Sequence, residues 1–145
     1  MLALVWLPAC NPSSIGFTTD WPVSGKVAED ALRNTGFRCT EEGRELYPAL
    51  YACTLVDESR SGGIYLYADD RNELVGIRAF SSDSSTYFFD QALDLAFPSR
   101  NLGNQLTFDP SEQKIDLADD ILVETGRSDD VRYLRITPRN KIHVQ

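Results

Sequence analysis

The chain has 145 residues and a formal net charge of −8, from 14 basic and 22 acidic residues. Hydrophobic residues make up 42% and charged residues 25% of the chain, which is the composition of one globular domain. The acidic balance disfavours nucleic acid as a partner, because the chain repels a phosphate backbone. No apolar run approaches the ~20 residues of a membrane span. With one histidine and three cysteines, we expect neither a metal site nor a cofactor.

The first ten residues, MLALVWLPAC, form an apolar run that ends in small residues before a cysteine. Leu7-Pro8-Ala9-Cys10 resembles the lipobox of bacterial lipoproteins, although Pro8 departs from the residue type usual there. The resemblance implies a truncated signal segment over 1–9 and a lipid on Cys10. It places the protein outside the cytoplasm, in the bacterial cell envelope, with that lipid as its only membrane contact. No basic residue precedes the run, so the alternative is a short buried strand in a cytoplasmic protein starting at Met1.

The remaining two cysteines favour a disulfide. Cys39 and Cys53 lie in FRCTE and YACTLV, two strand-like runs separated by a turn-prone stretch. Paired antiparallel, these runs bring the two thiols together, and the bridge would close a loop of about 15 residues worth ~3 kcal/mol. The alternative is a pair of buried reduced thiols, and an exported location favours the disulfide. Because the chain has no CxxC spacing, we expect no zinc site.

A helix is predicted over 25–35, with Ser24 as its N-cap and an apolar stripe formed by Val27, Ala28, Ala31 and Leu32. Gly36 is typical of the left-handed residue that ends a helix. The domain boundaries expected from the chain are a tether over 10–23, a single α+β domain over 24–137 and a flexible tail over 138–145.

Alternating apolar runs predict strands over 37–41, 51–56, 64–68, 74–80 and 131–137. The serines of 81–85 precede a strongly apolar helix over 86–97. A further helix is expected to begin at Asp109-Pro110, to carry Ile115, Ala118, Ile121, Leu122 and Thr125 at helical spacing, and to end at Gly126. The predicted fold is therefore α+β, an antiparallel sheet of about five strands packed with three helices.

The sequence lacks the residues that most known catalytic motifs require. A nucleophile–histidine site would need His143 in the C-terminal tail. The carboxylate doublets Asp69-Asp70, Asp119-Asp120 and Asp129-Asp130 are typical of solvated turns and helix surfaces. A carboxylate-based hydrolase stays open as an alternative function, as does an acidic immunity or inhibitor protein that shields a basic partner.

One face of the predicted sheet carries a distinctive set of side chains. If Ile64, Leu66, Val75, Ile77, Leu134 and Ile136 pack on the helices, the opposite face presents three arginines, Arg38, Arg78 and Arg135, and no carboxylate. Tyrosine and arginine are enriched at protein interfaces. The alternative is that they are ordinary strand and solvent-facing residues. We therefore expect a non-catalytic, lipid-anchored binding module for a protein or glycan, with a partner surface made of Tyr65, Tyr67, Arg78, Tyr133 and Arg135.

Overall fold

The computed structural model describes residues 21, 24–42, 49–55, 61–97, 113–118 and 121–139. The lipobox-like segment with Cys10, the signal segment 1–9, most of the tether and His143 lie outside these residues.

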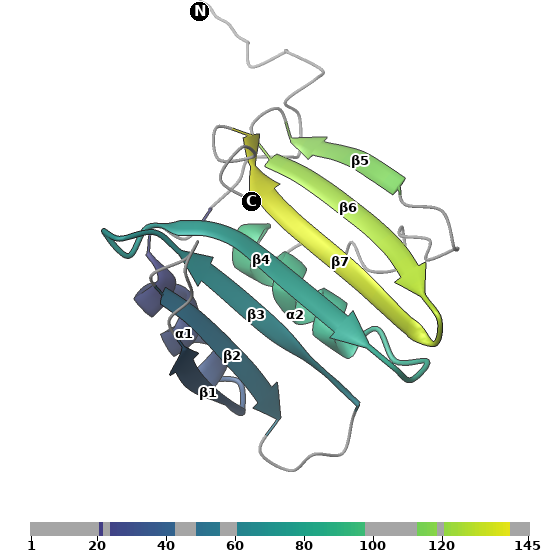
Figure 1. Ribbon diagram of the computed structural model, residues 1–145, viewed down its shortest axis with the longest axis horizontal. Coiled ribbons are helices and arrows are strands. Elements are labelled where there is room, and N and C mark those ends of the chain that lie inside the picture. The colour runs from purple at the N-terminus through teal and green to yellow at the C-terminus, as the bar shows by residue number, and fades with distance from the viewer. Residues whose placement is uncertain are drawn as a thin grey trace, which may run out of the picture.

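The described chain forms one antiparallel sheet and two helices (Figure 1). The sheet has seven strands in the order β1-β2-β3-β4-β7-β6-β5, and every neighbouring pair is antiparallel. The elements in chain order are α1 (Gly25–Arg33), β1 (Phe37–Glu42), β2 (Ala49–Leu55), β3 (Gly62–Ala68), β4 (Leu74–Ser81), α2 (Tyr87–Ala96), β5 (Gln113–Ala118), β6 (Ile121–Ser128) and β7 (Val131–Pro138).

Both helices pack on the same face of the sheet, and Figure 1 shows them behind the strands. The core lies between the helices and this face, where strand side chains such as Ile64, Leu66 and Ile136 are fully buried against α2 residues such as Phe88 and Phe89. The opposite side of the sheet, which we call the open face, points toward the viewer in Figure 1. Neither helix of the described chain has the length and apolar character needed to cross a membrane.

The start and end of α1 follow the sequence signals. Ser24 Oγ accepts a hydrogen bond from the Val27 backbone N–H at 3.0 Å, and Gly36 adopts φ 102°, the left-handed conformation that suits glycine. An Arg33 Nη2 atom donates to Glu29 at 2.9 Å and to the Cys39 carbonyl oxygen at 2.7 Å. This arginine therefore ties the last turn of α1 to β1.

Cys39 and Cys53 are directly opposite each other on β1 and β2. Their sulfur atoms lie 2.06 Å apart, at disulfide distance, and both residues belong to the core on the helix face. The expected pairing of these two cysteines is therefore present in the structure.

The helix expected to end at Gly126 is wrong. Residues Gln113–Ala118 and Ile121–Ser128 instead form the hairpin β5–β6, in which Ala118 pairs with Ile121. The apolar positions chosen for their helical spacing omitted Val123, which is buried in the core beside Ile121, so a period of two describes this run better than 3.6. The sheet thus gains two strands over the number expected, and the described chain has two helices rather than three.

Two smaller expectations also change. Val75 was expected to pack on the helices, but it is buried outside the core cluster. A bulge between Tyr67 and Ala68 pairs Ala68 with Leu74, so Leu74 joins the cluster instead. Strand β7 runs to Pro138, which is buried opposite Ile121, so the predicted tail begins inside the sheet. Residues 140–145 lie outside the described residues.

Candidate functional site

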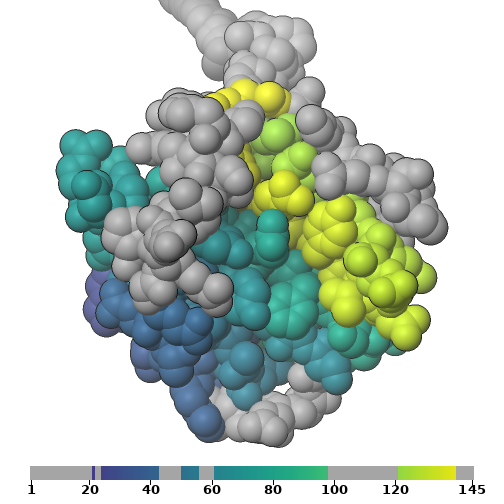
Figure 2. Space-filling model, viewed as in Figure 1, coloured from purple at the N-terminus to yellow at the C-terminus, as the bar shows by residue number. Residues whose placement is uncertain are grey.

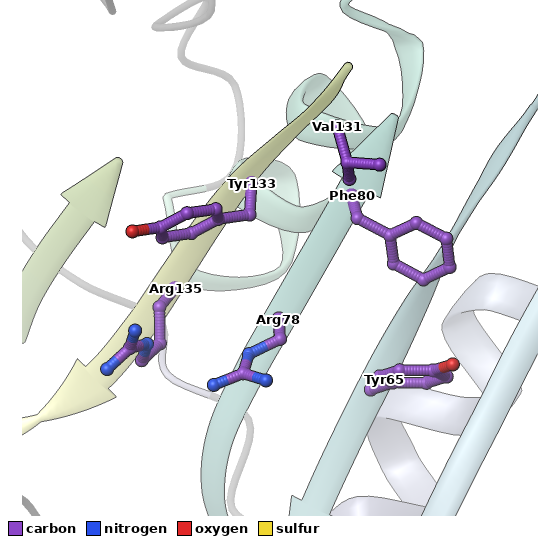
Figure 3. A pocket seen from close by; sticks show the side chains of 6 residues that line it. All are labelled: Tyr65, Arg78, Phe80, Val131, Tyr133 and Arg135. Carbon is purple, nitrogen blue, oxygen red and sulfur yellow. The ribbon is translucent and has the colours of Figure 1, made fainter. Parts of the chain in front are cut away.

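An open groove lies on the open face where β3, β4 and β7 meet (Figure 2). Its volume is about 370 Å³, within the range of small-molecule sites. Four of the five residues expected at the partner surface line it, and two residues join them. We call this site the Arg78 groove, and it is lined by Tyr65, Arg78, Phe80, Val131, Tyr133 and Arg135 (Figure 3).

Strand register brings these side chains together. Arg78 on β4 lies opposite Tyr65 on β3 and opposite Arg135 on β7, and Phe80 lies opposite Tyr133. Residues two apart on a strand share a face, so Arg78 and Phe80 on β4 stand beside Tyr133 and Arg135 on β7. The groove is therefore a consequence of antiparallel pairing between two strands separated by α2 and the β5–β6 hairpin in the sequence.

Glycines on β3 and β6, the strands that flank β4 and β7, explain why the groove is hollow. Phe80 and Tyr133 are direct cross-strand partners, yet their rings point away from each other (Figure 3). A Cβ atom on Gly63 would lie 3.3 Å from Phe80 Cζ, and one on Gly126 would lie 2.5 Å from Tyr133 Cζ. Each ring thus lies over a glycine of the strand beyond it, on β3 or on β6. The space left between the rings is the upper part of the groove.

The two arginines of the groove differ in their partners. Arg135 Nη1 lies 3.6 Å from Glu124 Oε1, and its guanidinium carbon lies 6.0 Å from the centre of the Tyr133 ring. The Nε atoms of both arginines are buried and have no hydrogen-bond partner among the described residues, so the two differ in their ion pairs. No described carboxylate forms an ion pair with Arg78. The half-buried Arg78 guanidinium therefore lacks the charge-assisted hydrogen bonds that its fork of N–H donors could make to a carboxylate.

The expectation that this face carries no carboxylate is wrong. Glu124 on β6 pairs with Arg135 on β7 across the strands and shares its face. The error follows from the predicted helix, which removed Glu124 and Gly126 from the sheet. Phe80 and Val131 were also missed, although their two-residue spacing from Arg78 and Tyr133 was a usable signal.

Tyr67, the fifth expected residue, lies on the same face but does not line the groove. It pairs with Gly76 on β4 and with Leu50 on β2, and it lies two residues from Tyr65 along β3. Tyr67 is therefore a neighbour of the groove.

Two of the three carboxylate doublets lie in hairpin turns. Asp69 Oδ1 accepts hydrogen bonds from the backbone N–H groups of Arg71 and Glu73, both at 2.9 Å, so it holds the β3–β4 turn. Asp129 has φ 55° in the β6–β7 turn. Asp119-Asp120 lies outside the described residues. Within the part of the chain that the structure describes, no cluster of three potential metal ligands occurs.

Comparison of the chain with protein-family models, with curated proteins and with solved structures found no match.

Proposed function

We propose that this chain is a non-catalytic binding module of the bacterial cell envelope, and that its open face captures a partner protein through an acidic group on that partner. The observation that carries the proposal is Arg78, a half-buried guanidinium without a hydrogen-bond or ion-pair partner among the described residues. It lies at the centre of a groove walled by aromatic rings. Arginine and tyrosine in a hollow of this kind are the side chains that dominate protein interfaces.

Charge supports an acidic partner over a basic one. The groove is lined by two guanidinium groups, and the Glu124 carboxylate lies beside it against Arg135, so the local charge is positive on a chain whose net charge is −8. An immunity or inhibitor protein for a basic partner would instead need an acidic hollow. A hydrolase would need two converging carboxylates, and the residues lining the groove supply none.

The envelope location and lipid anchor rest on two features. One is the likeness of Leu7–Cys10 to a lipobox, which lies outside the described residues. The other is the Cys39–Cys53 pair, because disulfides persist in oxidising compartments and are rare in the cytosol.

The experiment is site-specific photo-crosslinking in the bacterial host. A photoreactive phenylalanine analogue replaces Tyr67, beside the groove, or Lys26, whose side chain is 60% exposed on α1 and on the other side of the sheet. We expect a cross-linked species from position 67 that is absent from position 26 and lost when Arg78→Ala is added. Protease digestion of that species identifies a protein partner, whereas glycosidase digestion identifies a glycan and contradicts the proposal in that respect. Equal cross-linking from both positions, or no effect of Arg78→Ala, contradicts the use of this face.

A further inference from the structure

The charges and the apolar walls of the Arg78 groove limit the kind of ligand that it can bind. Its floor contains two like charges in direct register, Arg78 on β4 and Arg135 on β7. The Arg135 and Glu124 side chains are 27% and 10% exposed, so this ion pair is partly withdrawn from water. The charge of Arg135 is therefore largely matched within the protein, while the charge of Arg78 is not matched by any described residue.

This difference sets the charge of a suitable ligand. Two guanidinium groups lining the groove and the Glu124 carboxylate beside it leave a local net charge of +1. One carboxylate would match that charge and would meet the guanidinium fork of Arg78 with two parallel hydrogen bonds. A phosphate monoester, with about −1.5 to −2 charges at neutral pH, would exceed it and would be repelled by Glu124.

The side walls of the groove favour a ligand that carries an apolar or aromatic group beside its charge. The Tyr65 and Phe80 rings contact each other on one side, with centroids 5.4 Å apart, and Tyr133 lies on the other side, over Gly126. Val131 closes one end beside Phe80. An apolar or aromatic group placed between these rings would be removed from water, which favours its binding. A bare anion would leave these walls exposed.

We infer that the Arg78 groove is a binding site for a single carboxylate attached to an apolar or aromatic group. Arg78 anchors the carboxylate, and the rings of Phe80 and Tyr133 hold the apolar part. The inference rests on the function proposed above and specifies which acidic group of the partner is recognised. A free aromatic acid and the C-terminal residue of a peptide share this chemistry.

Phenylacetate is the first probe, with NMR signals of the aromatic rings as the readout on the folded chain. Acetate lacks the ring, benzyl alcohol lacks the charge, and phenyl phosphate carries the higher charge. We expect saturable binding of phenylacetate that shifts the ring signals of Tyr65, Phe80 and Tyr133. Each of the three comparison compounds should bind about tenfold more weakly or worse, because each loses one of the two contacts or meets Glu124. Binding of phenylacetate no tighter than that of acetate would overturn the inference.

The variants use a matched pair of arginines. Arg78→Gln should weaken phenylacetate by about tenfold or more, since a charge-assisted pair is lost. Arg38→Gln, on the same face but at the exposed β1 edge, should leave the affinity unchanged. Arg78→Lys keeps the charge without the fork and should give an intermediate affinity, which guards against a folding defect in the glutamine variant. Equal effects of Arg78→Gln and Arg38→Gln would contradict the assignment.

Glu124→Gln gives the sharpest test, because it leaves the charge of Arg135 unmatched. We expect this variant to bind phenyl phosphate more tightly than the original chain does, with a smaller gain for phenylacetate. No gain for the dianion overturns the charge argument. N-acetylglycylphenylalanine, as free acid and as amide, then distinguishes the sources: an acid that binds more tightly than phenylacetate indicates a peptide terminus. If phenylacetate fails while the cross-link at position 67 persists, this inference falls and the binding module stands. Failure of both overturns the two proposals together.

Discussion

Arg78 on β4 and Arg132 on β7 lie on opposite faces of the same sheet, and their guanidinium groups are used in opposite ways. An Arg132 Nη2 atom donates to the carbonyl oxygens of Asp83 and Ser85, in the segment that leads into α2, and the guanidinium lies 5.2 Å from the centre of the Phe89 ring. Arg132 therefore holds α2 against the sheet, whereas the buried Nε atom of Arg78 has no hydrogen-bond partner among the described residues.

This contrast predicts two different outcomes for the same substitution. Arg132→Gln should lower the free energy of unfolding by ~1.5–3 kcal/mol, because hydrogen bonds from a charged group to two partly buried carbonyl oxygens are lost. Arg78→Gln should change it by no more than ~0.5 kcal/mol. Urea unfolding monitored by circular dichroism measures both. A large loss of stability in Arg78→Gln would mean that the residue supports the fold.

The disulfide predicts a loss of stability on its removal. The double variant Cys39→Ala, Cys53→Ala should lose ~3 kcal/mol of unfolding free energy, because the unfolded chain is no longer constrained by the loop. The intact mass of the original protein should rise by two hydrogen atoms on reduction. An unchanged mass would show that the two thiols were free.

Gly126 predicts a steric test of the groove. A methyl group at this position would meet the Tyr133 ring, with Cε2 at 2.9 Å, so Gly126→Ala should displace the ring and lower stability by ~1–3 kcal/mol. In a Tyr133→Ala background the same change should be neutral or stabilising, because alanine costs less than glycine within a strand. Gly63→Ala is the milder comparison, because its added Cβ would lie 3.0 Å from the Cys53 carbonyl oxygen and 3.3 Å from Phe80 Cζ. Additive effects of Gly126→Ala and Tyr133→Ala would contradict the contact.

Asp94 on α2 predicts a pH-dependent gain in stability. Desolvation, and the neighbouring Asp90 four residues earlier, raise the pKa of the Asp94 carboxyl group. A folded-state pKa above the unfolded value favours the protonated form, so this contribution to stability is present at low pH and is lost as the pH rises through the folded-state pKa. Asp94→Asn should therefore stabilise the protein at pH 7 by ~0.2–0.5 kcal/mol, the size of a like-charge pair on a helix. The difference should vanish near pH 3, where thermal unfolding scans of both proteins should coincide.

The lipobox-like segment predicts membrane attachment through Cys10. In the bacterial host, Cys10→Ser should move the chain from the membrane fraction to the soluble fraction, because the acylated thiol is lost. A wild-type protein recovered in the soluble fraction with Met1 intact would contradict the lipid anchor.

The sequence by itself determined the elements whose signals are local. Ser24, the apolar stripe of α1 and Gly36 fix the first helix, since capping and periodicity act within a few residues. The alternation around Cys39 and Cys53 fixes two strands and the pairing of the cysteines. The parity of Tyr65, Arg78, Tyr133 and Arg135 on their strands placed four groove residues on one face.

Only the tertiary structure decided the identity of the β5–β6 hairpin and the form of the groove. The residues chosen from 115 to 125 suited a helix. Pairing of β6 with β7 selected the strand, because it joins the backbone groups of the two strands and buries Ile121 and Val123 in the core. In β6, Glu124 forms an ion pair with Arg135, and Gly126 leaves room for the Tyr133 ring. No signal in β4 or β7 alone contains that information, because the hollow is made by glycines one strand further out on each side.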